Sequence, residues 1–486
     1  MTLSTLILLF AAVGLVLTLI VKAFKRLESW PISFLQNFVG AWFIFSGAVK
    51  AVDPLGTAYK MEQYFGELET TFAGSGMSFL APLFPWLAQH VNAFSVFMIV
   101  LEIVLGAMLI IGANRKLVAW TLFITLVFFT FLTGFTYLTG YVPEGVNFFQ
   151  FGKWGPYVET NMKVTDCGCF GDFIKLKPKT SFIKDIFLLI PGIWFLLASG
   201  KMHQLFTRLY RSGIVTLGIV GSTIYCISNY VWNLPDVDFR PFYIGNNIRD
   251  QKQRETEAQQ NVKVISYKLT NKASGQIVEI PYEQFMAEFK NYPKEDWTFE
   301  QIKSEPEIEH TKISDFEVSD LEGNNVTEDI LNNPDYAIMI VAYKLYGTSE
   351  SQELMRYDSV FLTDSLGQPT GILASVDSIT TQSEIFHPDK KYLMPWHNAA
   401  CPLIQEAAAA GIKTYVISGY AGPERFAQFQ QAAGCNTTFF TADDILLKTI
   451  VRSNPGFVLM KDGKIVHKWH HKKLPEFAEI QARFMQ

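Results

Sequence analysis

Charged residues are scarce in this chain of 486 residues. They make up 18% of the sequence, whereas hydrophobic residues make up 49%. Soluble proteins usually carry about 25% charged residues, so this balance predicts membrane-spanning segments. The formal net charge is -5, and without a basic excess we expect no nucleic-acid partner. The five cysteines are too few for a disulfide-rich scaffold.

Long apolar runs lie in the first half of the chain. A helix needs roughly 20 mostly apolar residues to cross a bilayer, and six segments qualify: residues 3–21, 34–52, 91–112, 117–139, 182–199 and 214–232. The first segment lacks the basic stretch that precedes the apolar run of a cleaved signal peptide, so we predict a retained span. Residues 1–233 are therefore predicted to form an all-α polytopic helix bundle in contact with membrane lipid.

Basic residues in the short connections predict the orientation of the bundle. They follow the first span and lie between spans three and four and between spans five and six, as Lys22, Lys25, Arg26, Arg115, Lys116, Lys201, Arg208 and Arg211. All of these connections face the cytoplasm, as the positive-inside rule requires, if the N-terminus faces outward. The chain after residue 233 then lies outside the cytoplasm. For a bacterium with two membranes we predict a multi-pass inner-membrane protein whose C-terminal domain is periplasmic.

The second half of the chain is more polar and reads as α/β. Residues 234–310 are predicted to be a linker and a small α+β module. From residue 311 to 486, apolar strand-like runs alternate with helical patterns in the order strand, helix, strand, helix, hairpin, helix. This half predicts an extracytoplasmic α/β domain.

The α/β domain contains two short sequence motifs that resemble those of a known family. Ile313-Ser-Asp-Phe with Leu321-Glu-Gly-Asn, and Asn454-Pro455-Gly-Phe before a Val-Leu-Met strand, resemble the N-terminal hairpin and the cis-proline strand of the thioredoxin superfamily. The nearest branch is TlpA-like. The resemblance implies a cis bond before Pro455. It also implies a Cys-x-x-Cys helix after the strand at 337–343, where this chain has no cysteine and an insertion at about 344–395 instead.

Cys401 begins the helix after that insertion. Three interpretations remain open: a single thiol that replaces the missing motif, a small buried apolar residue, and a disulfide with Cys435.

The first half of the chain resembles the DoxX family, and within it the MauE-like redox-associated branch. The residues that carry the resemblance are Ser46-Gly-Ala-Val-Lys50 before Asp53-Pro, Glu102-Ile-Val-Leu-Gly, and Asp166-Cys-Gly-Cys-Phe-Gly171 followed by Lys184-Asp185 at the start of a span. The resemblance implies a membrane protein associated with thiol redox chemistry.

The Cys-Gly-Cys loop is the most specific motif. A bond between Cys167 and Cys169 would close a small, strained ring, and such bonds are labile and suited to redox exchange. The alternatives are an unreactive thiol pair and a metal pair. No further histidine or cysteine stands near it, so we predict no metal site. His467, His470 and His471 are interleaved with lysines and read as a solvated basic edge.

Ionisable residues in or beside the spans are further candidates. Glu102 lies within a span, where a carboxylate is expensive, so it is expected to pair with Lys50, to line a polar pocket, or to tie helices together. Lys50 and Asp53 are expected at the solvated membrane interface. These three residues, with Cys401 and Pro455, are the accessory site candidates.

Two functions of different class follow. The first is a membrane redox protein in which Cys167 and Cys169 exchange electrons with a quinone or with an extracytoplasmic protein partner, while the thioredoxin-like domain serves for docking. The second is a non-catalytic assembly or scaffold subunit of an envelope complex, favoured by the missing Cys-x-x-Cys. No cofactor is assigned, and quinone is one candidate.

Overall fold

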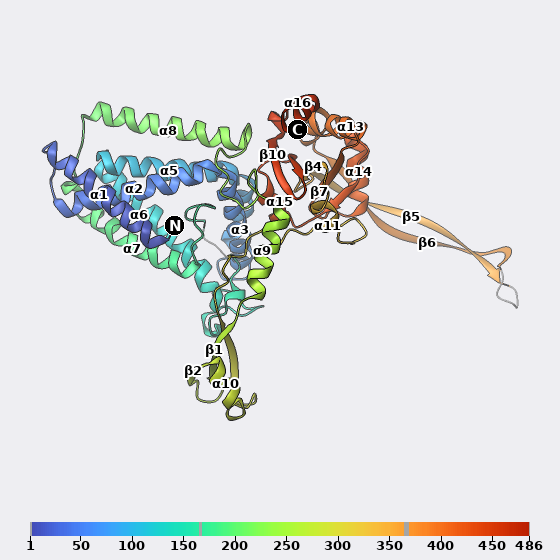
Figure 1. Ribbon diagram of the computed structural model, residues 1–486, viewed down its shortest axis with the longest axis horizontal. Coiled ribbons are helices and arrows are strands. Elements are labelled where there is room, and N and C mark those ends of the chain that lie inside the picture. The colour runs from blue at the N-terminus through green and yellow to red at the C-terminus, as the bar shows by residue number, and fades with distance from the viewer. Residues whose placement is uncertain (1, 165–167, 364–368, 486) are drawn as a thin grey trace. The chain divides into compact units, whose positions relative to one another are not determined.

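The computed structural model describes residues 2–164, 168–363 and 369–485. The chain divides into two compact units, Met1–Arg240 and Pro241–Gln486 (Figure 1). The first unit is helical and the second contains the sheets.

Six helices of the first unit are long and apolar enough to cross a membrane. They are α1 (Leu3–Ala23), α2 (Trp30–Val52), α5 (Val91–Ile111), α6 (Arg115–Leu138), α7 (Pro178–Leu197) and α8 (Arg208–Val231). All six predicted segments are confirmed as helices. Several begin earlier than predicted, because hydropathy marks only the apolar part of a helix; α2, for example, starts beside a proline that fits a first turn.

Shorter helices fill the connections between the long ones. The loop after α2 forms α3 (Pro54–Ala73) and α4 (Leu83–Gln89), which the sequence analysis did not predict. Single 3-10 turns complete the unit: η1 (Ser78–Leu80), η2 (Thr139–Tyr141), η3 (Phe151–Lys153), η4 (Glu159–Asn161) and η5 (Ser199–Lys201). The amphipathic α3 packs its buried face against α5.

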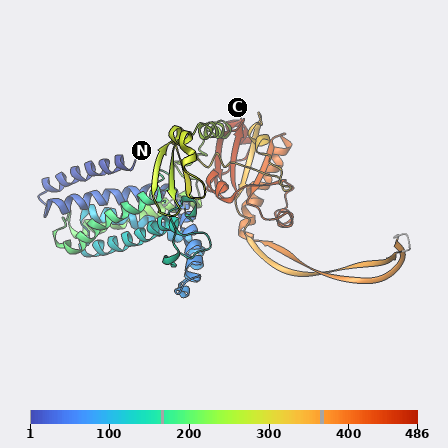
Figure 2. The same cartoon turned by 90° about the horizontal axis from the view of Figure 1, so that it is seen from below.

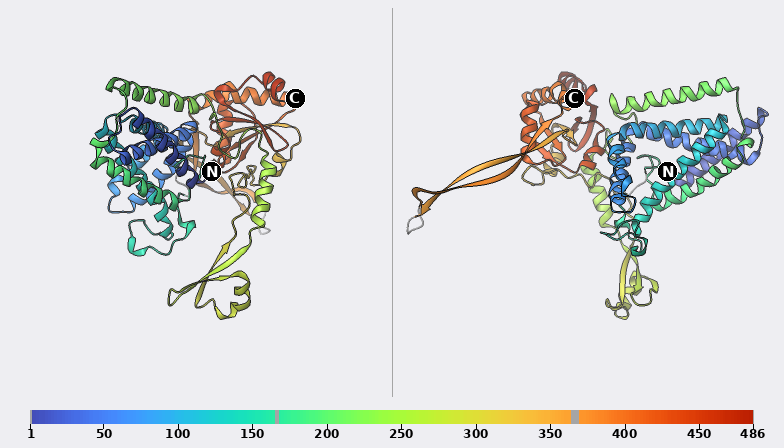
Figure 3. Two further views of the ribbon diagram at one scale, coloured as in Figure 1. Left: turned by 60° about the vertical axis from the view of Figure 1, so that its left-hand side comes forward. Right: turned by 180° about the vertical axis from the view of Figure 1, so that it is seen from behind.

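Helices α2 and α5 approach closely, because glycines face each other at their contact. A Cβ atom added to Gly106 would lie 2.5 Å from the carbonyl oxygen of Gly40, and one added to Gly47 would lie 3.1 Å from the backbone nitrogen of Ile103. Small residues allow such backbone contact between helices in membranes. Helix α8 runs beside α5 (Figure 3), and its Asn229 amide donates to the last carbonyls of α2.

The second unit begins with a helix where the sequence predicted a linker. This helix, α9 (Ile248–Gln260), is capped by Asn247. It buries the carboxylate of Glu255, which accepts hydrogen bonds from the backbone and hydroxyl of Thr311 and from Ser314. The polar composition of the helix hid it from the sequence analysis, because only Ile248, Ala258 and the hydrogen-bonded Glu255 are buried in it.

A small sheet and a larger one follow. The small sheet has the order β2-β1-β3, from β1 (Val264–Asn271), β2 (Ile277–Pro281) and β3 (Trp297–Lys303), with α10 (Tyr282–Glu288) and η6 (Phe289–Asn291) between β2 and β3. The larger sheet has the order β10-β9-β4-β7-β8, from β4 (Tyr336–Ala342), β7 (Lys413–Ser418), β8 (Phe439–Thr441), β9 (Gly456–Lys461) and β10 (Lys464–His470).

The central strand of the larger sheet is β4, as the apolar run predicted. It pairs in parallel with β7 and antiparallel with β9, so that Ile340 lies between Val416 and Phe457. The helices are α11 (Thr327–Leu331), α12 (Lys390–Pro395), the π-turn η7 (Trp396–Ala400), α13 (Cys401–Ala409), α14 (Pro423–Ala433), α15 (Asp444–Ile450), η8 (His471–Lys473) and α16 (Phe477–Phe484). The strands and helices predicted from 337 onward are present in the predicted order, and the strands β5, β6 and β8 were not predicted.

Two details of the thioredoxin-like resemblance have different outcomes. The Asn454–Pro455 peptide bond is cis, as predicted. The N-terminal hairpin expected at 313–324 is reduced to an antiparallel bridge between Ser319 and Asn325, and Ser319 also forms an isolated bridge with Thr441. Asp320 closes the turn of this short hairpin by accepting from the backbone of Glu322 and Asn324.

The insertion at 344–395 forms a long antiparallel ribbon. It consists of β5 (Gly347–Thr363) and β6 (Pro369–Pro388), which form a two-stranded sheet of their own and leave the body of the unit (Figure 2). The base of the ribbon is fixed to α14, where Arg425 pairs with Glu384 at 2.6 Å and Gln428 accepts from the backbone of Phe386.

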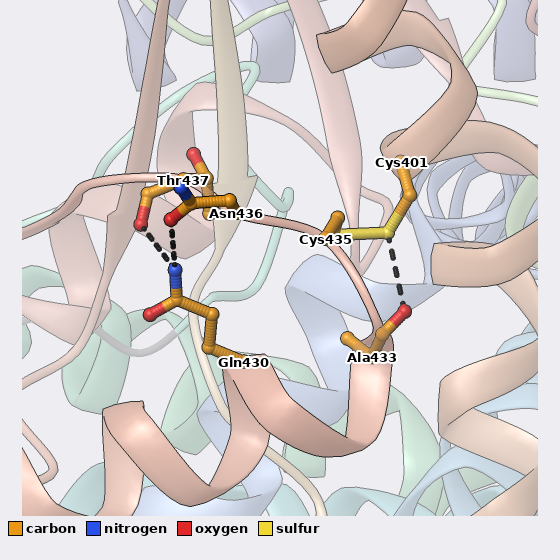
Figure 4. The surroundings of a disulfide bond; sticks show 6 residues. All are labelled: Cys401, Gln430, Ala433, Cys435, Asn436 and Thr437. Carbon is orange, nitrogen blue, oxygen red and sulfur yellow. Dashed lines mark hydrogen bonds between the residues drawn. A yellow bond between two sulfur atoms is a disulfide. The ribbon is translucent and has the colours of Figure 1, made fainter.

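Cys401 forms a disulfide with Cys435, which resolves the three interpretations left open by the sequence. Figure 4 shows the bond between Cys401, at the start of α13, and Cys435, two residues after the end of α14. The Cα atoms are 5.4 Å apart, and Gln430 donates to Asn436 and Thr437 beside the bond. Cys401 is therefore not a single thiol.

The expected solvated edge on β10 is wrong. Lys468 and His470 are 5% and 3% exposed. The ammonium of Lys468 donates to the carbonyls of Phe242 and Ile450, because the strand lies under the segment that enters this unit.

Candidate functional site

A cavity of about 50 Å³ lies among α2, α3, α5, α6 and α7 in the first unit. Its charged and polar lining comprises Ser46, Lys50, Thr57, Lys60, Tyr64, Glu102, Thr133, Cys169, Lys184 and Asp185, and aromatic and aliphatic side chains complete it. A buried water needs roughly 10–15 Å³ of such volume, so the cavity accommodates about three to five waters.

The first ion pair of the cavity joins α2 to α5. Lys50 Nζ lies 2.6 Å from Glu102 Oε1, and the two side chains are 7% and 2% exposed. The Ser46 hydroxyl lies 2.8 Å from the other Glu102 oxygen and 2.9 Å from the carbonyl oxygen of Cys169. The glycine contact between the helices makes this short distance possible. Hydrogen bonds thus connect the carboxylate to the cysteine loop.

The second ion pair stands on α7. Lys184 Nζ lies 2.6 Å from Asp185 Oδ1, and Thr133 of α6 donates to the other oxygen of Asp185 at 2.9 Å. The ammonium also lies 5.8 Å from the centre of the Phe170 ring. Two ion pairs therefore face one small volume, to which Lys60 adds a third cation, and each carboxylate has a hydroxyl as a second partner.

The cysteine loop closes this cavity. Phe170 is fully buried and packs edge-on against Trp42, so it anchors the loop to the helix bundle. Gly168 and Gly171 have φ of 59° and 54°, the left-handed conformation that glycine adopts most readily. A backbone hydrogen bond from Gly171 to Gly168 closes the turn. Cys169 is thereby held half-buried at the cavity, and Cys167 lies outside the described residues.

The thiol of Cys169 experiences opposing effects. Burial raises its pKa most strongly, the Lys184 and Lys50 charges lower it, and the Asp185 charge raises it. The resulting pKa is above the ordinary value, so the thiol at rest is protonated at neutral pH.

Of the three accessory candidates in the first unit, the structure places Glu102 and Lys50 at the cavity and Asp53 outside it. Glu102 does pair with Lys50 and does line a polar pocket, so both of those expectations are met. The solvated position expected for Lys50 is wrong, since the residue is 6% exposed. Asp53 lies outside the cavity: it caps α3 through the Gly56 amide, and its carboxylate is 4.0 Å from the Arg240 guanidinium.

The remaining two candidates belong to the second unit. Pro455 follows Asn454, whose side chain accepts from the Tyr392 hydroxyl and donates to the carbonyl of Lys344. Cys401 is held in its disulfide. Within the described ranges, no group of three or more potential metal-ligating side chains gathers.

The sequence analysis did not identify several of the polar residues that line the cavity. Lys184 and Asp185 were noted only as part of a motif, and Thr133 and Tyr64 not at all. A signal was present, because two adjacent charges inside the predicted span 182–199 are as costly in a bilayer as Glu102. The hydroxyl partners carried no such signal, since Ser and Thr are common in membrane helices.

Comparisons with protein-family models, with curated proteins and with solved structures found no match for this chain. The geometry of the cavity is therefore the basis for a functional argument.

Proposed function

We propose that this chain is an integral membrane protein that carries out thiol–disulfide exchange outside the cytoplasm, with Cys167 and Cys169 as the redox pair. The observation that carries the proposal is the position of Cys169, half-buried at a cavity lined by two ion pairs. A structural cysteine needs no charged cavity, whereas a sulfur that changes charge during a reaction benefits from nearby cations and proton-bearing groups.

The site and both ion pairs belong to one end of the helix bundle. Lys50 is near the C-terminal end of α2, Thr133 near that of α6, and Lys184 near the N-terminal end of α7. This end lies opposite the basic connections, and under the positive-inside rule that supports an extracytoplasmic position for the site. The disulfide of the second unit supports the same side for that unit, because disulfides persist in oxidising compartments.

The proposed family relations agree with this placement. A DoxX and MauE-like first unit would be a bacterial inner-membrane domain. The order β10-β9-β4-β7, with two antiparallel pairs followed by a parallel pair, supports a thioredoxin-like second unit. No cysteine occurs at 343–349 after β4. We therefore assign this unit to docking a partner protein in the periplasm and not to chemistry.

The reaction balances with a protein dithiol as substrate. Its two thiols are oxidised to a disulfide, and the Cys167–Cys169 bond is reduced to two thiols that take up the two electrons and two protons. A two-electron acceptor of the quinone class then removes both electrons and both protons, becomes a quinol, and restores the bond.

The ribbon β5–β6 favours a second function, a scaffold subunit of an envelope complex. A two-stranded sheet is marginally stable by itself in water, and in the described part of the chain neither strand has another neighbour. Unpaired strand edges are templates for another chain. A partner protein that pairs with the ribbon would stabilise it and cover its unpaired strand edges, and this function needs no redox step.

Differential thiol alkylation of native membranes, read by mass spectrometry, tests the choice. Reversible oxidation of Cys167 and Cys169, and loss of cellular function in either serine variant at normal abundance, are expected for the redox protein. Cys226→Ser is the matched control, since Cys226 is a fully buried free cysteine in α8. Permanently reduced thiols, together with full activity of both serine variants, would exclude the redox function and favour the scaffold function.

A further inference from the structure

Large apolar side chains are exposed on the segment that joins α3 to α5. This segment contains η1 and α4, and no Asp, Glu, Lys or Arg occurs between Glu69 and Glu102. Its exposed surface, named here the α4 surface, comprises Met77, Phe79, Leu83 and Trp86, which are 37–77% exposed. An apolar surface of this kind, without charge, marks a place that another apolar phase or molecule covers.

The neighbouring helix α3 has an exposed face of the opposite character. Glu62, Gly66 and Glu69 are exposed and recur at helical spacing along it. The two helices nevertheless belong to one packed cluster, in which the ring of Phe72 lies 5.3 Å from that of Phe84. Within one compact hairpin, α3 therefore presents carboxylates to water, whereas α4 presents apolar side chains alone.

The adjoining span α5 sets the depth of the α4 surface. Its 21 residues extend about 31 Å at 1.5 Å per residue, which matches the roughly 30 Å thickness of the hydrocarbon core. Arg115 and Lys116 follow its C-terminal end, so its N-terminal end lies at the opposite membrane surface. Only His90 separates α4 from α5, and the Trp86 ring packs against the His90 ring at 4.9 Å. Trp86 thus lies at the level where the span begins.

We propose that the α4 surface lies in the lipid bilayer, at the boundary between headgroups and acyl chains, as an interfacial helix that does not cross the membrane. Such helices present Trp, Phe and Leu to the lipid, and Trp favours this depth because its ring is apolar and its N–H is polar. Lipid is favoured over a protein partner because α4 runs directly into α5, whose exposed Phe97 belongs to a spanning helix.

This contact anchors a helix that forms part of the cavity. The contact between Phe72 and Phe84 joins α4 to the C-terminal part of α3, while the N-terminal part of α3 reaches the cavity. Figure 1 shows α3 running across the direction of α5 at one end of the first unit. The lining residues that α3 contributes are Thr57, Lys60, Met61 and Tyr64. The lipid therefore holds one end of α3 while the other end covers the two ion pairs.

Alkylation of introduced cysteines with a charged, water-soluble maleimide tests this position. The full chain is reconstituted in phosphatidylcholine and phosphatidylglycerol nanodiscs with one copy per disc, and each site is read by mass spectrometry. Phe79→Cys and Trp86→Cys are compared with Glu69→Cys, which is also exposed and belongs to the same hairpin. Lipid desolvates a thiol and raises its pKa by about one unit or more, so positions 79 and 86 should react at least roughly tenfold more slowly than position 69.

Phe97→Cys is the control for a thiol covered by lipid, since Phe97 is 58% exposed on a spanning helix. Rates at positions 79 and 86 that equal the rate at position 69 would overturn the inference. Protection in fragmented native membranes that is absent from nanodiscs would also overturn it, because a protein would then cover the surface. If Trp86→Cys does not accumulate, Leu83→Cys replaces it with the same expectation.

Photocross-linking identifies what covers the surface in the nanodiscs. Phe79→p-benzoylphenylalanine should form adducts with lipid, whereas adducts with peptides from the second unit would overturn the inference. The inference does not depend on the cysteine chemistry. Failure of the proposed function, seen as serine variants with full cellular activity, therefore leaves these rates and adducts unchanged.

Discussion

Removing one partner of the Lys50–Glu102 pair should strongly destabilise the helical unit. With 7% and 2% side-chain exposure and 2.6 Å between Nζ and Oε1, this pair is buried. Breaking a buried pair leaves an uncompensated charge and typically costs about 3–5 kcal/mol. For a unit of this size that corresponds to a fall in Tm of roughly 6–20 °C. We expect this loss for both Lys50→Met and Glu102→Gln.

The double variant should behave differently from either single variant. Replacing both members by uncharged groups of similar volume is often neutral or stabilising, so Lys50→Met with Glu102→Gln should lie within about 1 kcal/mol of the wild type. The resulting coupling energy of several kcal/mol identifies a direct interaction.

Equilibrium unfolding of the full chain in mixed micelles, followed by circular dichroism, measures these values. Glu28→Gln is the matched control in the same unit, because Glu28 is 57% exposed and its nearest Arg115 nitrogen is 3.8 Å away; this change should cost less than about 1 kcal/mol. Single variants at Lys50 and Glu102 that cost no more than this control would refute the reasoning.

Three further outcomes follow from other parts of the chain. Replacing both Cys401 and Cys435 by serine removes a cross-link across 34 residues and should lower the stability of the second unit by about 4 kcal/mol in a thermal melt, whereas a melt unchanged by reductant would contradict this. Gly106→Ala places a Cβ 2.5 Å from a backbone oxygen and should cost about 1–3 kcal/mol in the micelle assay, while Gly66→Ala, with open space around it, should not destabilise. Burial raises the pKa of Glu255, but its hydrogen bonds outweigh burial and hold the pKa below the usual range. The stabilisation of the second unit by this carboxylate is therefore present above about pH 4.3 and is lost as the pH falls through the lowered pKa. Hydrogen exchange at 311–316 should report that loss, and Glu255→Gln should remove the pH dependence.

Elements with strong periodicity or long apolar runs were predictable from the sequence. Long apolar runs mark the six long helices and the central strand β4, and the turn at Asp462-Gly463 marks the hairpin β9–β10. The helix α9 and the ribbon β5–β6 were not predicted. Both are polar, and their formation depends on contacts with distant residues, such as Glu255 with Thr311 and Gln428 with Phe386.

The candidate site was predictable in part for the same reason. A single carboxylate in an apolar run identifies Glu102, and the lysine near the end of the preceding span identifies its partner. The sequence does not show how far a helix end lies from solvent, and Lys50 was therefore predicted to lie at the solvated membrane interface. Its ammonium contacts Glu102 of α5 and lies 5.3 Å from the centre of the Phe129 ring of α6, and the sequence does not show that these distant residues meet it.

The Lys50–Glu102 pair also has a consequence for biosynthesis. Lys50 stands two residues before the end of α2, so before α5 has been synthesised its ammonium can extend to the water at the membrane surface. Ser95 lies level with Pro54, to whose carbonyl it donates, and Glu102 follows seven residues later, about 10 Å deeper at 1.5 Å per residue. The carboxylate is therefore the charge that enters the bilayer, and the cation that neutralises it is already in the membrane when it arrives. In this order of translation, neither charge waits alone in the hydrocarbon core.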